Sequence, residues 1–197
     1  MTSTSFFRIW LLILVAALAL VVPGVCQTPT AIESKASYLL TNNDSGARSA
    51  VPISLASLGI SAGDTIQIQT QGDFSFCFPT GCPEIQVPAC GVFSSTATLL
   101  SGNNLHRVVG AAPITNGSVS PCVTGPTLFG QVPTDISEDF LLDGSSMTVP
   151  NGSRYLFVAV ADIFYGDNAD PNTGTIRRAS RVGSETELFP KVLCHLL

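Results

Sequence analysis

The stretch YLFVAVA, residues 155–161, is the part of this sequence that decides the fold. It is almost wholly apolar, and the turn-forming residues Pro150-Asn151-Gly152 stand just before it. An apolar run of only seven residues between turn signals is typical of a strand that is buried on both sides, and it is short for a helix. We therefore expect residues 155–161 to form a central strand.

Other strand signals surround this run. Residues 65–70 read TIQIQT, a strict alternation that predicts a half-buried strand, and Gly63-Asp64 marks a turn before it. Residues 140–142 and 146–149 bracket Asp143-Gly144, which predicts a hairpin.

Two further strands are expected at LFGQV, residues 128–132, and from Thr175-Ile176 onward. No amphipathic helix and no internal repeat is visible after residue 26. Many short strands separated by turns predict an all-β fold, an antiparallel β-sandwich.

The first 26 residues have the layout of a signal peptide. Ile9–Val22 is an unbroken apolar run, Arg8 precedes it and Pro23-Gly24 ends it. We expect cleavage after Cys26, and a secreted, cell-surface or periplasmic protein with no stable membrane span after cleavage. An uncleaved anchor is the alternative, although a span usually needs about 20 apolar residues.

The remaining chain divides into three parts by composition. Residues 27–50 are polar and are expected to form a leader with at most one short strand near residues 38–40. Residues 51–176 carry the strand signals and are expected to form the sandwich domain. Residues 177–197 turn basic and then apolar, and are expected to form a C-terminal tail.

Residues 77–126 are expected to form a long loop braced by disulfides, with short strands at 96–100 and 105–109. Four of the cysteines lie in this segment, and they allow three pairings in an oxidising compartment. We prefer Cys77 with Cys82 and Cys90 with Cys122, and Cys194 is left over. A zinc site is disfavoured because the cysteines form no CxxC pair.

Charge and motifs exclude several classes of function. The net charge of −5 argues against a nucleic-acid partner. The sequence contains no Gly-x-Ser-x-Gly elbow, no His-Glu-x-x-His and no phosphate-binding glycine loop, so we do not expect an enzyme.

The segment ADIFYGDNADPNTGTI, residues 161–176, follows the central strand and is rich in hard oxygen donors. These donors suit calcium, which takes six to eight oxygens, but Asp and Asn also favour turns without any metal. An EF-hand starting at Asn168 fails, because Thr173 stands where glycine is needed and Ala179 where glutamate is needed. The five donors are Asp162, Asp167, Asn168, Asp170 and Asn172.

The order of these features is similar to that of the PA-IL-type galactose-binding lectins and related exported bacterial domains. One signature matches Gly59-Ile60, Gly63-Asp64 and the strand TIQIQT closed by Gly72. The other matches YLFVAVADIFYGDN followed by Gly174-Thr175-Ile176. The resemblance covers residues 51–76 and 127–176, and it implies a jelly-roll, galactose-binding-like sandwich.

The resemblance also implies a calcium site. Asp162, Asp167 and Asn168 match the side-chain ligands, while the backbone carbonyls of Phe164 and Phe76 match two further donors. In that family the calcium contacts two sugar hydroxyls, and the residue pair matched by Asp167-Asn168 bridges metal and sugar.

Two departures from the family pattern bear on the sugar position. The loop between Asp162 and Asp167 is two residues shorter than in the lectin itself. Residues 169–173 are an insertion, which either extends the site with Asp170 and Asn172, shifts the register so that Asn172 takes the asparagine role, or blocks the sugar.

The leading hypothesis is a secreted, calcium-dependent, galactoside-type carbohydrate-binding domain. Oligomerisation is then expected, because single weak sites gain avidity by multivalency. The alternative is a structural cell-surface domain in which calcium only stabilises a loop, or is absent. A third possibility, an accessory module of a secreted hydrolase, would need a catalytic partner domain.

Overall fold

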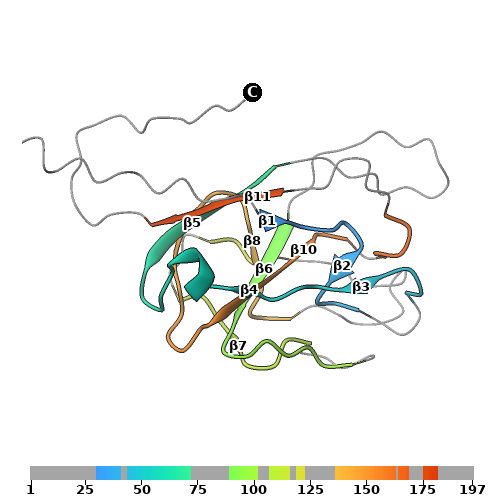
Figure 1. The fold of residues 1–197 in the computed structure, drawn as a ribbon, viewed down its shortest axis with the longest axis horizontal. Coiled ribbons are helices and arrows are strands. Elements are labelled where there is room, and N and C mark those ends of the chain that lie inside the picture. The colour runs from blue at the N-terminus through green and yellow to red at the C-terminus, as the bar shows by residue number, and fades with distance from the viewer. Residues whose placement is uncertain are drawn as a thin grey trace, which may run out of the picture. The chain divides into compact units, whose positions relative to one another are not determined.

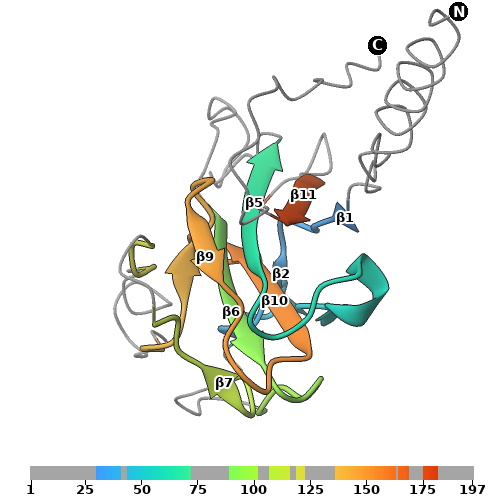
Figure 2. The same cartoon turned by 90° about the vertical axis from the view of Figure 1, so that its left-hand side faces the viewer.

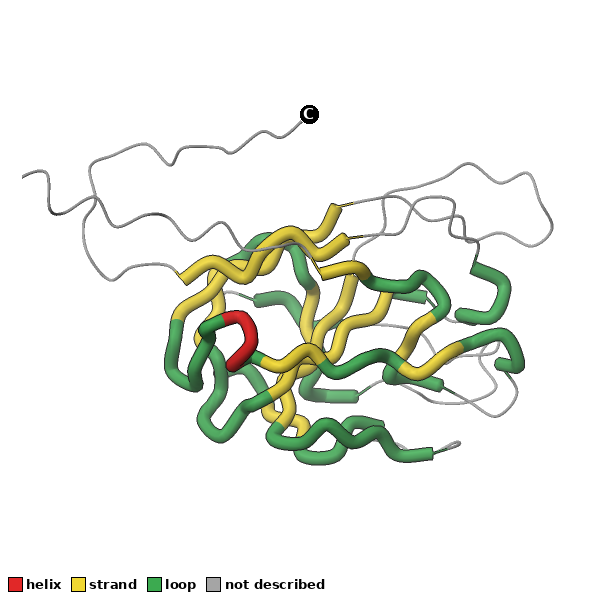
Figure 3. The backbone as a smooth tube through the Cα atoms, viewed as in Figure 1, coloured by secondary structure: helices red, strands yellow, loops and turns green. Residues whose placement is uncertain are grey.

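The computed structural model describes eight stretches of the chain, which lie between residues 27 and 190. In these stretches the chain forms strands and loops, with a single 3-10 turn at Ala56–Leu58 and no α-helix (Figure 3). The described residues are 30–40, 44–71, 89–101, 107–115, 119–122, 136–162, 164–168 and 175–181.

The first sheet has four strands in the order β1-β11-β5-β9, and every pair is antiparallel (Figure 2). Its long members, β11 and β5, pair with each other along most of their length. The strands are β1 (Thr30–Ala31), β11 (Thr175–Arg181), β5 (Thr65–Gln71) and β9 (Ser146–Thr148).

The second sheet is also antiparallel and is centred on β10 and β6, which pair from Tyr155↔Ser94 to Val160↔Ala89. Three shorter strands flank this pair, and a separate parallel pair joins β2 to β3. The strands are β4 (Ile53–Ser54), β10 (Tyr155–Val160), β6 (Ala89–Ser94), β7 (Ala111–Ala112), β8 (Phe140–Leu141), β2 (Ala36–Ser37) and β3 (Arg48–Ser49).

The apolar character of β10 follows from burial on both of its faces. Leu156 and Val158 join a hydrophobic cluster that includes Ile66 and Ile68 of the first sheet. Phe157 and Ala159, which alternate with them, join a second cluster on the opposite face of the strand. Because successive side chains of a strand point to opposite faces, a strand covered on both sides needs an unbroken apolar sequence.

Several strand predictions are confirmed. The central strand forms as β10, and the alternating TIQIQT run forms most of β5. The turn before β5 places Gly63 at a φ of 87°, a left-handed conformation that favours glycine. The last strand begins at Thr175, as expected, and continues to Arg181, beyond the expected domain boundary at residue 176.

The hairpin predicted around Asp143-Gly144 is wrong. Strands form on both sides of the turn, but β8 pairs with β6 in the second sheet and β9 pairs with β5 in the first. The turn therefore carries the chain from the second sheet, where Figure 1 labels β8, to the first sheet, where Figure 2 labels β9. Phe140 and Met147, which flank the turn, lie in the same hydrophobic cluster, so both strands contribute to one core from different sheets.

The prediction of one long loop over residues 77–126 is wrong for residues 89–94. These residues form β6, which is buried along its whole length. Of the short strands expected at 96–100 and 105–109, the described residues form one isolated bridge, Leu99↔Val108. The preferred pairing of Cys90 with Cys122 is confirmed and ties β6 to a neighbouring loop.

The segment expected to be a polar leader contributes to the fold. The described residues of 30–50 form β1, β2 and β3, and they bury Tyr38 and Leu39 in the cluster that covers the second face of β10. This segment packs onto the core because the apolar side chains of Tyr38 and Leu39 cover β10 and remove apolar area from water.

Some expectations lie outside the described residues. They are the signal peptide at 1–26, the strand at 128–132, the cysteines Cys77, Cys82 and Cys194, and the tail beyond residue 181. Within the described part of the chain, no helix is long and apolar enough to cross a membrane.

Candidate functional site

The oxygen-rich loop begins where β10 ends, and Tyr165 anchors its middle. The Tyr165 side chain is fully buried, and its hydroxyl donates a hydrogen bond to the carbonyl of Val160, 3.1 Å away. The backbone N–H of Asn168 donates to the carbonyl of Tyr165 at 3.3 Å, which closes a turn over residues 165–168. Burial raises the pKa of the Tyr165 hydroxyl, so this group stays protonated as a donor.

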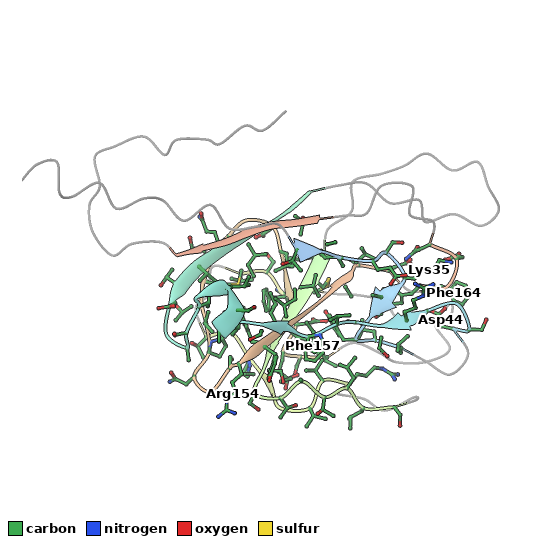
Figure 4. All side chains as sticks on the ribbon, viewed as in Figure 1. Lys35, Asp44, Arg154, Phe157 and Phe164 are labelled. Carbon is green, nitrogen blue, oxygen red and sulfur yellow. A yellow bond between two sulfur atoms is a disulfide. The ribbon has the colours of Figure 1, made fainter. Side chains whose placement is uncertain are left out.

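Residues of the N-terminal segment bind the backbone of this loop through hydrogen bonds. The Asp44 carboxylate accepts hydrogen bonds from the backbone N–H groups of Tyr165 and Gly166, each at 2.7 Å. The Lys35 ammonium donates to the carbonyl of Gly166 at 3.0 Å. Figure 4 labels Asp44, Lys35 and Phe164 close to one another. We call residues 34–40 and 44–46 the N-terminal clasp.

Two glycines allow the clasp and the loop to approach this closely. A Cβ atom on Gly46 would lie 2.6 Å from the carbonyl oxygen of Gly166. A Cβ atom on Gly166 would lie 2.5 Å from Oδ1 of Asp44. Both distances are too short for real side chains, so the contact requires glycine on each side.

The structure brings four of the predicted site residues into this loop. Asp162 is half-buried, and its Oδ1 accepts a hydrogen bond from the backbone N–H of Phe164 at 3.3 Å. Asp167 is also half-buried; burial and the nearby Asp44 charge raise the pKa of its carboxyl, while Lys35 opposes that shift.

Asn168 is deeply buried, with 1% of its surface exposed. Its side-chain Nδ2 donates a hydrogen bond to the carbonyl of Ser34 at 2.9 Å. The side-chain amide of Asn168 is therefore fixed against the N-terminal clasp. Its nitrogen binds the backbone carbonyl of Ser34, and its oxygen, Oδ1, takes no part in that hydrogen bond.

Three buried oxygens around this contact have no hydrogen-bond partner: Oδ1 of Asp167, Oδ1 of Asn168 and Oγ of Ser34. Buried polar atoms are normally satisfied, and an orphaned one costs about 1–3 kcal/mol. Two of the three atoms can only accept hydrogen bonds, and one of those belongs to a carboxylate. The missing partner is therefore a donor or a cation, and hard oxygens of this kind fit calcium.

The remaining predicted site residues, Phe76, Asp170 and Asn172, lie outside the described residues. Among the residues that are described, no group of three or more His, Cys, Asp or Glu side chains is placed to hold a metal. The expected calcium shell contains only two carboxylates, those of Asp162 and Asp167, and takes its other oxygens from an amide and from backbone carbonyls.

Sequence reasoning missed the clasp residues Ser34, Lys35 and Asp44. Asp44 stands in Asn43-Asp44-Ser45-Gly46, a pattern that signals a turn and carries no information about a partner more than 120 positions away. The available signal was the apolar pair Tyr38-Leu39 in an otherwise polar segment, which indicates a region packed against the core.

Comparison with known proteins identifies no relative of this chain. No family model, no curated protein and no solved structure matches this chain. The likeness to galactose-binding lectins therefore rests on the motifs in the sequence.

Proposed function

We propose that this protein is an exported, jelly-roll β-sandwich domain that binds carbohydrate of the galactoside type through a calcium ion held by residues 162–168. In this proposal Asp162, Asp167 and Asn168 provide side-chain oxygens, and Phe164 and Phe76 provide backbone carbonyls. The bound calcium would offer open coordination positions to neighbouring sugar hydroxyls. The protein's role is binding and not catalysis.

One observation carries the proposal: Asp167 and Asn168 are neighbours, and each has a buried side-chain oxygen without a hydrogen-bond partner. A neutral donor could satisfy one of these atoms. A cation can bind an amide oxygen and a carboxylate oxygen together, and it would also interact favourably with the charge of Asp167, whose Oδ1 is buried. The loop was predicted from sequence as a calcium loop, and these two residues were predicted as ligands.

The surroundings support the remaining parts of the proposal. The Cys90–Cys122 disulfide suits a protein that folds in an oxidising compartment. Asp167 is only half-buried, so a ligand can reach its side of the loop. Assembly into an oligomer would raise the avidity of such a site.

The alternative is a structural cell-surface domain in which calcium only braces the loop, and the burial of Asn168 favours it. With 1% of its surface exposed and its Nδ2 bonded to Ser34, Asn168 has little surface left for a sugar. In this alternative Asn168 is a ligand of the ion and does not contact a sugar.

Titration calorimetry separates the two candidates. We expect calcium to bind the wild-type protein and to raise its melting temperature, and chelation to reverse that rise, because a ligand of the folded state stabilises it. A galactoside is expected to bind only with calcium present, whereas Asp162→Ala loses both responses.

The matched control is Asp143→Ala, which removes a carboxylate from a turn between β8 and β9 and is expected to keep both responses. Calcium binding with no sugar response across a glycan array would select the structural alternative. The proposal fails if calcium releases no heat and Asp162→Ala melts like the wild type in calcium.

A further inference from the structure

We propose that Ser34 is a further ligand of the calcium site, so that the N-terminal clasp supplies part of the coordination shell. This inference rests on the proposed calcium site and is independent of whether that site binds sugar. Nothing in the sequence pattern of the loop points to Ser34, which precedes it by more than 120 residues.

The first argument is the contact between Ser34 and Asn168. The carbonyl of Ser34 accepts the hydrogen bond from Nδ2 of Asn168 at 2.9 Å. Oδ1 of Asn168 is on the same amide group as that nitrogen, so the proposed ligand atom and Ser34 are joined through one hydrogen bond. The backbone of Ser34 is therefore in direct contact with the amide group that carries the proposed ligand atom.

The second argument is the state of the Ser34 hydroxyl. Ser34 has none of its surface exposed, and its Oγ has no hydrogen-bond partner. A buried hydroxyl in this state costs about 1–3 kcal/mol. The same deficit occurs at Oδ1 of Asn168 and at Oδ1 of Asp167, so three unsatisfied oxygens come from two segments that touch each other.

Coordination chemistry connects these oxygens. Calcium takes 6–8 oxygens at about 2.3–2.6 Å and accepts neutral oxygens together with carboxylates. A serine hydroxyl binds through its lone pairs and needs no deprotonation for this role. In this proposal one ion is shared by the three orphaned atoms.

The clasp keeps Ser34 in place relative to the loop. Asp44 bonds the backbone of Tyr165 and Gly166, and Lys35, the next residue after Ser34, bonds the carbonyl of Gly166. The hydrogen bonds to Gly166 and to Asn168 lie on either side of Asp167. The segment that carries Ser34 is thus hydrogen-bonded to the loop on both sides of Asp167.

The test is Ser34→Ala, compared with Ser153→Ala as a matched control. Ser153 is also buried, at 7% exposed, and its Oγ also lacks a partner. It precedes β10 whereas the loop follows β10, and a six-residue strand separates them by roughly 20 Å. Alanine at position 34 keeps the backbone carbonyl that Asn168 uses.

We expect Ser34→Ala to bind calcium at least about tenfold more weakly than the wild type in titration calorimetry. In chelator its melting temperature should equal or exceed that of the wild type, because the change removes an unsatisfied buried hydroxyl. Ser153→Ala should show the same behaviour in chelator and wild-type affinity for calcium.

Terbium luminescence lifetimes in H₂O and D₂O give a second readout, since they count the waters on an ion bound in place of calcium. Ser34→Ala is expected to gain one bound water where the hydroxyl was. The number of waters on the ion should stay at the wild-type value if Ser34 has only a structural role.

Wild-type affinity in Ser34→Ala overturns the inference. So does a lower melting temperature in chelator with unchanged calcium affinity, which would mean that the hydroxyl binds a structural water. If the wild-type protein itself binds no calcium, the proposed function falls and this inference falls with it.

Discussion

Two loops of this molecule use an aspartate carboxylate to bind backbone N–H groups, but at very different distances along the chain. In the turn between β8 and β9, Oδ1 of Asp143 accepts from the N–H of Ser145 at 2.8 Å, two residues away. In the loop after β10, Asp44 binds the N–H groups of Tyr165 and Gly166, 121 and 122 residues away.

The comparison separates two ways of ordering a loop. The Asp143 turn is exposed and satisfies its own backbone, as Asp and Asn commonly do in turns. The loop at 164–168 is ordered by a buried carboxylate from the N-terminal clasp, so it depends on the tertiary fold. Two further carboxylates, Asp162 just before this loop and Asp167 within it, are the ones that the proposed function assigns to the ion.

The largest expected effect is that of Asp44→Ala. It leaves one buried and one partly buried N–H group without their charged acceptor, and we expect the free energy of unfolding to fall by about 3 kcal/mol. Asp143→Ala, in the exposed turn, should cost less than about 1 kcal/mol. Urea denaturation in chelator measures both, and equal losses would mean that Asp44 is no more important than a local turn residue.

A smaller effect is expected from Gly166→Ala, with a cost of about 1–3 kcal/mol, because the new Cβ would lie 2.5 Å from Oδ1 of Asp44. Gly152→Ala is the matched control: it has a φ of 81° and no atom within 4 Å of a new Cβ, so its cost of about 1–2 kcal/mol is local backbone strain.

Combining each glycine change with Asp44→Ala sharpens this second prediction. The cost of Gly166→Ala should shrink when Asp44 is absent, whereas the cost of Gly152→Ala should simply add. Denaturant midpoints of the wild type and of the single and double variants give one double-mutant cycle for Gly166 with Asp44 and one for Gly152 with Asp44. Additive behaviour at Gly166 would contradict the steric contact with Asp44.

The smallest expected effect is a pH dependence in the local turn. Hydrogen bonds from the side chain and backbone of Ser145 lower the pKa of the Asp143 carboxyl below its ordinary value of 3.8. A lowered folded-state pKa gives stability that is present above about pH 3.8 and is lost as the pH falls through the folded value. Asp143→Asn should therefore lose less stability than the wild type between pH 5 and pH 2.5.

Denaturation curves across this pH range test the prediction, with Asp64→Asn as a second exposed turn carboxylate for comparison. An identical pH slope in Asp143→Asn and wild type would contradict the role assigned to Ser145.

The sequence predicted the strands that have clear periodicity, and it missed those that do not. TIQIQT alternates because β5 has one face in the core, and YLFVAV is apolar throughout because β10 is covered on both faces. ACGVFS shows neither a strict alternation nor an unbroken apolar run, because Gly91 and Ser94 stand among its apolar residues, and the sequence therefore did not predict β6.

The candidate site divides in the same way. The sequence predicted a loop of oxygen donors after the central strand, and the described part of that loop contains Asp162, Phe164, Asp167 and Asn168, whose role as ligands stays a prediction. It did not predict that Asn168 would be buried against Ser34, or that Asp44 would bind the loop backbone.

By itself, the sequence determined the local features of this protein: the alternating and apolar strands, the turns at Gly63 and Asp143, and the gathering of oxygen donors after β10. Periodicity and turn chemistry act between near neighbours, so they are legible in order along the chain. The tertiary structure alone decided that β8 and β9 lie in different sheets, that Cys90 bonds Cys122, and that the N-terminal clasp closes over the loop. These choices depend on which distant surfaces bury apolar area together, and that free energy exists only once the chain has folded.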